Sequence, residues 1–333
     1  MAQLDAGTGR PLGPPLPVGG RPWQLARGPA GSLLALSTGP TAARPLTRVG
    51  RAGAGWAPPV AWPGPAYEAR LAGDGGRYAV VVDRAPAGPP TGPATAPACC
   101  RLTLVDVPAG GVAAAAAVGG PHELVTGLAL DDGPAGPVAY LALWRPGPGA
   151  PGAPGDPSGA AGAAGRVVAV DARTGAPVAV LPLGGKPVPL ALGPAPGRLG
   201  RRLYAVERLA GPEDEPPRPP RARVLGLHPT TLEVESERPL DVLPTRLAVA
   251  ADGAAAYALH DHSVTRLGLA GGPDRRLALL PARGLALAVA GDRVYVSSAY
   301  GPELWAFRRH DGRLLATLPV GAPATDLLGS AAG

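Results

Sequence analysis

Polar and charged side chains follow a proline at intervals along this chain, and together they could form a binding site. They are Trp23, Gln24, Tyr67, Glu68, His122, Glu123, Arg246, Thr325 and Asp326. Acidic, basic, imidazole and aromatic groups that converge in a concave place are typical of a ligand-binding pocket. A water-filled opening is polar as well. Whether these residues form a binding pocket or a solvent-filled opening depends on the strands and loops that carry them.

His260, Asp261 and His262 form a second cluster of residues that could do chemistry. The two histidines would share one face of an extended strand, at a spacing that could hold a metal ion. No third ligand is evident from the sequence. We therefore favour a solvated turn and predict no metal site or other cofactor here.

Cys99 and Cys100 are the only cysteines, and they are adjacent. Neighbouring residues of a strand point to opposite faces, so we expect that the pair does not bind one metal ion. A strained vicinal disulfide is one alternative, and two free thiols at the start of a strand are the other, which we favour. The sequence contains no Gly-x-Ser-x-Gly elbow, phosphate-binding loop or Cys-x-x-Cys motif.

A four-part pattern that recurs along the chain is clearest between residues 166 and 207. Apolar runs at 166–172 and 176–183 are followed, after a glycine-rich break, by runs at 188–193 and 201–207. Four short strands separated by tight turns form an antiparallel meander. The strand after the glycine-rich break is the first of each unit. First strands start at seven places, between 39 and 66 residues apart: Pro22, Pro65, Pro121, Pro187, Pro244, Arg283 and Pro323.

The clearest unit contains an Asp-x-x-Thr-Gly turn at 171–175, a proline at Pro187 and a Leu-Tyr pair at 203–204. Similar residues recur at Asp5, Thr8, Gly9, Asp252, Gly253, Val320, Gly321 and Pro323. This unit resembles the YVTN-type β-propeller repeat family over nearly the full chain, although the sequence has no asparagine to complete that signature. The resemblance implies a WD40-like arrangement of stacked blades and says almost nothing about function.

Physical reasoning leads to the same fold. A four-stranded unit is too small to bury both of its faces alone, and units stacked in a closed ring leave only short edges. The sequence therefore predicts an all-β protein: a seven-bladed β-propeller of four-stranded antiparallel blades, as a single domain over residues 1–333.

The last blade is expected to be incomplete or repacked. The chain begins on a third strand and ends on a first strand, so this blade would combine both ends. Only six second strands are recognisable, and the missing one belongs to this blade. Neighbouring strands lie about 4.8 Å apart, so the strands on either side of the missing one could not pair with each other.

Three Pro-rich insertions, near residues 86–98, 145–164 and 211–220, separate second and third strands in consecutive blades. In an antiparallel blade this loop emerges on the face where the first strand begins. The insertions and the mouth of the central channel are therefore expected on one face. The nine residues that follow the leading prolines would surround that mouth.

Composition limits the partners. Lys186 is the only lysine and there is no isoleucine, as expected for a GC-rich bacterial genome, so the net charge of +6 does not predict nucleic-acid binding. No run of 18 apolar residues predicts a membrane span. The first ten residues lack the features of a signal peptide, so the compartment stays open, and an extracytoplasmic location would need a leader or anchor before Met1.

Two classes of function fit these observations. The favoured one is a non-catalytic binding protein, with no catalytic residues, whose looped face and channel mouth bind an unknown protein, peptide or cell-surface polymer. The alternative is a propeller enzyme such as a metal-dependent lactonase-like hydrolase, with Glu68, Glu123 and Asp326 around a divalent ion. A quinone-dependent enzyme is disfavoured because Gly13, Ala179 and Ala316 occupy the positions where its repeat carries tryptophan.

Overall fold

The computed structural model describes most of the predicted strands and the walls of a central cavity. The described residues are Thr8, Gly13, 21–29, 32–38, 46–49, 70–73, 75–84, 99–120, 122–146, 164–197, 200–209, 222–320 and 324–327. The expected insertions near 86–98 and 211–220, and all but the ends of the one near 145–164, lie outside this part.

The described strands form one three-stranded and five four-stranded antiparallel sheets, each built from consecutive strands. The first sheet contains β1 (Arg21–Arg27), β2 (Leu33–Thr38) and β3 (Leu46–Val49). The second contains β4 (Arg70–Gly73), β5 (Tyr78–Arg84), β6 (Cys100–Asp106) and β7 (Gly111–Val118), and the third β8 (Leu124–Gly133), β9 (Gly136–Arg145), β10 (Ala164–Asp171) and β11 (Pro177–Leu183). The fourth contains β12 (Lys186–Pro194), β13 (Arg201–Arg208), β14 (Ala222–Leu227) and β15 (Val234–Leu240). The fifth contains β16 (Arg246–Val249), β17 (Ala256–His260), β18 (Ser263–Leu267) and β19 (Arg275–Leu279), and the sixth β20 (Gly284–Ala290), β21 (Arg293–Ser298), β22 (Glu303–Arg308) and β23 (Leu314–Pro319).

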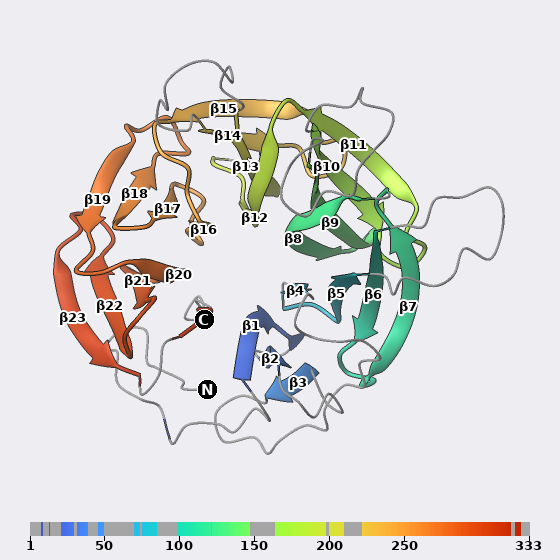
Figure 1. Cartoon of the computed structure of the whole chain (residues 1–333), viewed down its shortest axis with the longest axis horizontal. Coiled ribbons are helices and arrows are strands. Elements are labelled where there is room, and N and C mark those ends of the chain that lie inside the picture. The colour runs from blue at the N-terminus through green and yellow to red at the C-terminus, as the bar shows by residue number, and fades with distance from the viewer. Residues whose placement is uncertain are drawn as a thin grey trace.

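The sheets stand around a ring like blades, with β1, β4, β8, β12, β16 and β20 innermost (Figure 1). Each innermost strand contacts the innermost strand of the next sheet, from β1 through to β20. No α-helix occurs among the described residues, and none of them belongs to a helix that could cross a membrane. The all-β meander predicted from the repeat is thus confirmed.

The predicted turn chemistry is visible in the unit around Asp171. Asp171 Oδ1 accepts hydrogen bonds from the backbone N–H groups of Arg173 and Thr174, at 2.8 and 3.1 Å. Gly175 closes the turn with a φ of 73°, in the left-handed region that favours glycine. The Asp-x-x-Thr-Gly segment therefore fixes the connection between β10 and β11.

Burial follows from the stacking of the sheets. Second strands such as β9 contain a run of consecutive buried residues, because neighbouring sheets cover both of their faces. The outermost strands β11 and β15 instead alternate between more and less exposed positions. The apolar clusters lie between sheets: Val80 and Leu102 of the second sheet pack with Leu141 and Val168 of the third.

The end of the described chain lies between the sixth sheet and the first. Ser297 Oγ of β21 donates a hydrogen bond to the Ala324 carbonyl at 2.7 Å. The backbone N–H of Leu25 in β1 donates to Asp326 Oδ2 at 2.8 Å. Residues 324–327 contain no strand, although a seventh first strand was expected there, and the other expected strands of that blade lie outside the described residues. The described part thus contains six sheets, and a seventh blade stays a prediction.

Candidate functional site

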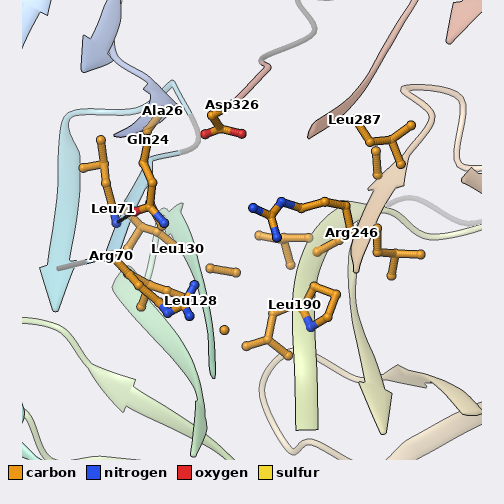
Figure 2. Close-up of a pocket in the computed structure, with 18 of the residues that line it drawn as sticks. Gln24, Ala26, Arg70, Leu71, Leu128, Leu130, Leu190, Arg246, Leu287 and Asp326 are labelled. Carbon is orange, nitrogen blue, oxygen red and sulfur yellow. Dashed lines mark hydrogen bonds between the residues drawn. The ribbon is translucent and has the colours of Figure 1, made fainter. Parts of the chain in front are cut away.

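The innermost strands surround a central cavity of about 2120 Å³. Apolar side chains form much of its walls, as the innermost sequences LVTGLAL, PVPLALG and GLALAVA predict. Figure 2 shows several of the leucines that line it. The apolar lining includes Leu71, Leu128, Leu130, Leu190, Leu192, Leu247 and Leu287.

Irregular pairing near the start of several innermost strands changes which side chains face the cavity. The register shifts between Pro22 and Gln24 in β1, and similar shifts occur early in β8, β12 and β20. An extra residue in one strand bends it and re-aims the neighbouring side chains. Polar side chains cluster at this end of the cavity, which we call the proline-side mouth: Gln24, Arg70, His122, Arg246 and Asp326. Of these, Gln24 lies at such a shift.

Asp326 and Gln24 are held by backbone groups. Asp326 Oδ2 accepts from Leu25 N–H at 2.8 Å, and Oδ1 accepts from its neighbour Leu327 at 2.9 Å. Burial raises the pKa of Asp326 above its usual value, while these two hydrogen bonds and the positive charge of Arg246 act in the opposite direction. Gln24 Oε1 accepts from Leu71 N–H at 2.6 Å. Both side chains therefore connect the first sheet to its neighbours.

Two guanidinium groups extend into the cavity from different sheets. Arg70 begins β4, and its Nε donates to the Val125 carbonyl at 2.9 Å. Arg246 begins β16 and is exposed, and its Nη1 donates to the Thr245 carbonyl at 3.0 Å. Burial lowers the pKa of Arg70, and the like charge of Arg246 lowers it further. The two positive charges are thus close enough to repel each other.

Six of the nine residues predicted from the sequence line the cavity: Gln24, His122, Glu123, Arg246, Thr325 and Asp326. Trp23 belongs to β1, but its side chain lies outside the description, and Tyr67 and Glu68 lie outside the described residues. Glu123 is engaged in the fold, because Arg166 donates to both of its oxygens at 2.8 and 2.7 Å. The Gly120 N–H also donates to Glu123.

Arg70 and Lys186 are among the cationic residues of the lining that sequence reasoning missed. Arg70 was overlooked because it lies five positions after Pro65, beyond the residues that directly follow the leading proline. Lys186 was overlooked because it precedes its proline. The Lys186 Nζ lies 4.2 Å from the centre of the Trp144 ring, a cation–π contact. Burial and the nearby charge of Arg208 lower the pKa of Lys186.

The expectation that the two cysteines point apart is wrong. Cys99 lies in a bend before β6, so strand alternation does not apply, and the two sulfur atoms hydrogen bond at 2.9 Å. Both thiols are free and border the cavity. The contact lowers the pKa of Cys99, because the thiolate can accept a hydrogen bond from Cys100, and the same contact and burial raise the pKa of Cys100.

The solvated turn expected at His260 is also wrong for that residue. His260 ends β17 and is 7% exposed, while Asp261 and His262 form the exposed turn. The His260 ring contacts Thr265 Oγ1 at 3.1 Å and the Leu243 carbonyl at 3.4 Å. Burial lowers the pKa of His260 below its ordinary value. Within the described ranges, no group of three or more His, Cys, Asp or Glu side chains is placed to hold a metal ion.

Charged residues at the other end of the cavity pair with each other. We call this end, where the innermost strands finish, the turn-side mouth; Arg201, Asp252 and Arg309 line it, and Asp131 is the partner of Arg201. Arg201 Nη1 donates to Asp131 Oδ1 at 2.8 Å, which connects β13 to β8 of the neighbouring sheet. Arg309 Nη2 donates to Asp252 Oδ2, which connects the sixth sheet to the fifth.

A ring of antiparallel meander sheets around a central cavity defines a β-propeller-like protein. No family model and no curated protein matches the sequence. Solved structures that are similar include Kuenenia stuttgartiensis hydrazine synthase, with 15% identity and a TM-score of 0.60 over 92% of this chain and 89% of that one. Saccharomyces cerevisiae Sqt1 has 11% identity and a TM-score of 0.53 over 91% and 74%. Apo AztD from Citrobacter koseri has 14% identity and a TM-score of 0.51 over 98% and 93%. At these identities the likeness concerns the fold alone.

Proposed function

We propose that this chain is a non-catalytic β-propeller binding protein that holds its ligand at the proline-side mouth of the central cavity. The observation that carries the proposal is the convergence of Gln24, Arg70, Arg246 and Asp326 on one partly apolar cavity of about 2120 Å³. Apolar walls with a few convergent polar groups are typical of ligand-binding pockets.

The proposal includes the architecture expected from the repeat. The chain is a single domain over residues 1–333 with a YVTN-like unit, and its two ends contribute to a seventh blade. In support, residues 324–327 connect the sixth sheet to the first through Ala324 and Asp326. The three Pro-rich insertions then extend the binding face, on which a protein, peptide or cell-surface polymer could make further contacts.

The lactonase-like alternative has less support. Of its three acidic residues, Glu123 is bound by Arg166 and Asp326 by two backbone N–H groups, while Glu68 lies outside the described residues. An acid bound in this way has to break an existing contact before it can coordinate a metal ion. Binding without chemistry is therefore the function that we propose.

A variant that narrows the cavity tests this proposal. Ala191 lines the cavity without belonging to an apolar cluster between sheets, so Ala191→Trp should place an indole ring in the cavity while preserving the fold. The control is Ala115→Trp on the exposed face of the outermost strand β7. A library of small molecules and short peptides is screened by ligand-observed NMR. We expect ligands that bind Ala191→Trp more weakly than the wild type and the control, and the absence of any such ligand would contradict the proposal.

A further inference from the structure

Arg70 and Arg246 approach the same space from opposite sides of the proline-side mouth. Figure 2 shows the side chain of Arg70 on β4 and that of Arg246 on β16, both directed into the cavity. Their mutual repulsion contributes to the lowered pKa of Arg70. Two like charges in a partly desolvated space are unfavourable unless a negative charge lies between them.

The acidic groups at this end of the cavity are engaged by other donors, although the charge of Arg246 acts on Asp326. Asp83 receives two hydrogen bonds from Arg101, and Glu123 receives two from Arg166. Asp326 accepts from two backbone N–H groups. Among the described residues, no carboxylate forms an ion pair with Arg70 or Arg246.

Both guanidinium groups keep donors available for a ligand. Arg70 uses its Nε for Val125, and Arg246 uses one Nη for Thr245. Guanidinium nitrogens hydrogen bond to carboxylates in a planar, often bidentate geometry that provides both energy and orientation. The remaining nitrogens of the two residues could therefore bind one carboxylate together.

The walls next to these arginines are apolar. Leu128 and Leu190 line the same cavity, are only partly buried, and are labelled beside the arginines in Figure 2. Burying apolar surface against them contributes about 25 cal/mol for each Å² removed from water. A small inorganic anion would leave these walls unused, whereas a ligand with a long apolar part would cover them.

We propose that the proline-side mouth binds an organic carboxylate with an apolar body, its carboxylate between Arg70 and Arg246 and its apolar part against the leucine walls. This inference rests on the proposed function and names the chemical class of the ligand. Lys186 adds a further positive charge to the lining and would favour the approach of an anion.

Isothermal titration calorimetry with three probes tests the inference. Decanoate has the carboxylate and the apolar chain, decylammonium has the same chain with the opposite charge, and acetate lacks the chain. We expect decanoate to bind the wild type, and the other two to bind at least about tenfold more weakly. Equal binding of decanoate and decylammonium would overturn the requirement for an anion.

Substitutions of the two arginines complete the test. Arg246→Met and Arg70→Met should each weaken decanoate binding at least about tenfold, since each removes a charge-assisted hydrogen bond. The control is Arg276→Met, which removes an exposed positive charge on β19, outside the cavity. If Arg70→Met fails to fold, Arg246→Met decides alone, because its described side-chain bond is only to its own neighbour Thr245.

The outcomes separate this inference from the proposed function. If decanoate fails to bind, or ignores both arginine substitutions, while other ligands lose binding in Ala191→Trp, the carboxylate inference is wrong and the binding function stands. If decanoate ignores both arginine substitutions and no ligand loses affinity in Ala191→Trp, both proposals fail.

Discussion

The two ends of the central cavity use arginine in different ways. At the turn-side mouth, Arg201 pairs with Asp131 and Arg309 pairs with Asp252, in each case between neighbouring sheets. At the proline-side mouth, Arg70 and Arg246 have no carboxylate partner among the described residues and repel each other. The paired charges connect the sheets, whereas the two arginines without a carboxylate partner are the groups that the proposed ligand would use.

Buried acids farther from the cavity are also paired, in contrast to the two arginines inside it. Within the sheets on the proline side, the buried acids Glu207 and Asp83 pair with Arg223 and Arg101 of the next strand. A buried acid without its partner is strongly unfavourable, and an exposed pair contributes little. The stability of the fold should therefore depend on these outer pairs far more than on the arginines in the cavity.

The largest expected effect comes from removing the partner of Glu207. Glu207 is 0% exposed and accepts from Arg223 at 2.7 Å and from the Gly185 N–H at 2.8 Å. Arg223→Met should lower the free energy of unfolding by about 3–5 kcal/mol, because it leaves a buried charge with one neutral donor. Urea unfolding measures this change.

Arg238→Met is the control for this substitution, because the pair that Arg238 forms with Asp274 is partly exposed. Its loss should cost less than about 1 kcal/mol. Equal losses for the two variants would mean that burial of the acid does not decide the strength of these pairs.

A smaller effect should distinguish the two mouths directly. Arg246→Met should reduce decanoate affinity at least about tenfold, or roughly 1.4 kcal/mol, while it changes the free energy of unfolding by less than about 1 kcal/mol. Arg309→Met should leave the affinity unchanged and lower stability slightly, because Asp252 loses its partner. Calorimetry and urea unfolding on both variants check the pattern, and a loss of affinity in Arg309→Met would remove the difference between the mouths.

His260 should make stability depend on pH. Its folded-state pKa lies below the unfolded value of about 6.5, because burial disfavours the charged ring. The unfolded chain therefore binds more protons as the pH falls below that value. The stability that neutral His260 contributes is present above about pH 6.5 and is lost as the pH falls toward the folded-state pKa.

The free energy of unfolding, measured between about pH 7 and pH 5, checks this sign. His260→Gln should flatten the dependence, whereas His310→Gln, at a site 73% exposed, should retain it. A slope that persists in His260→Gln would assign the effect to other groups.

The smallest effect concerns the cysteines. Cys99 should react with iodoacetamide before Cys100, because the contact between them lowers the pKa of Cys99 and raises that of Cys100. Peptide mapping by mass spectrometry follows both rates as a function of pH. Cys100→Ala should slow the alkylation of Cys99 near neutral pH, since the thiolate then lacks its donor. Faster alkylation of Cys100 in the wild type would contradict the assignment.

Much of the fold was predictable because its signals are local. Each strand is a short apolar run, and turns such as the one at Asp171 contain their own hydrogen-bond acceptor. The repeat also placed Gln24, Arg246 and Asp326 on the cavity, since equivalent positions of a repeated unit face the same way. Arg70 was missed because the offset between Pro65 and the start of β4 differs from that in other units.

The remaining features depend on partners far away in the sequence. Glu123 looked like a free acid, yet Arg166 binds it from 43 positions along the chain. His260 looked like part of a turn, but Leu243 and Thr265 enclose its ring. A pattern of residue types does not show which charged side chains form ion pairs with each other. These ion pairs determine which charged groups remain for the proposed ligand.

The most direct test of the carboxylate site is a crystal structure of the protein with an ω-bromo fatty acid. Anomalous scattering locates the bromine independently of the rest of the ligand. We predict the bromine inside the leucine-lined cavity and the carboxylate within hydrogen-bond distance of both Arg70 and Arg246. A ligand bound outside the cavity, or one whose carboxylate lies at the turn-side mouth beside Arg201 or Arg309, would contradict the account.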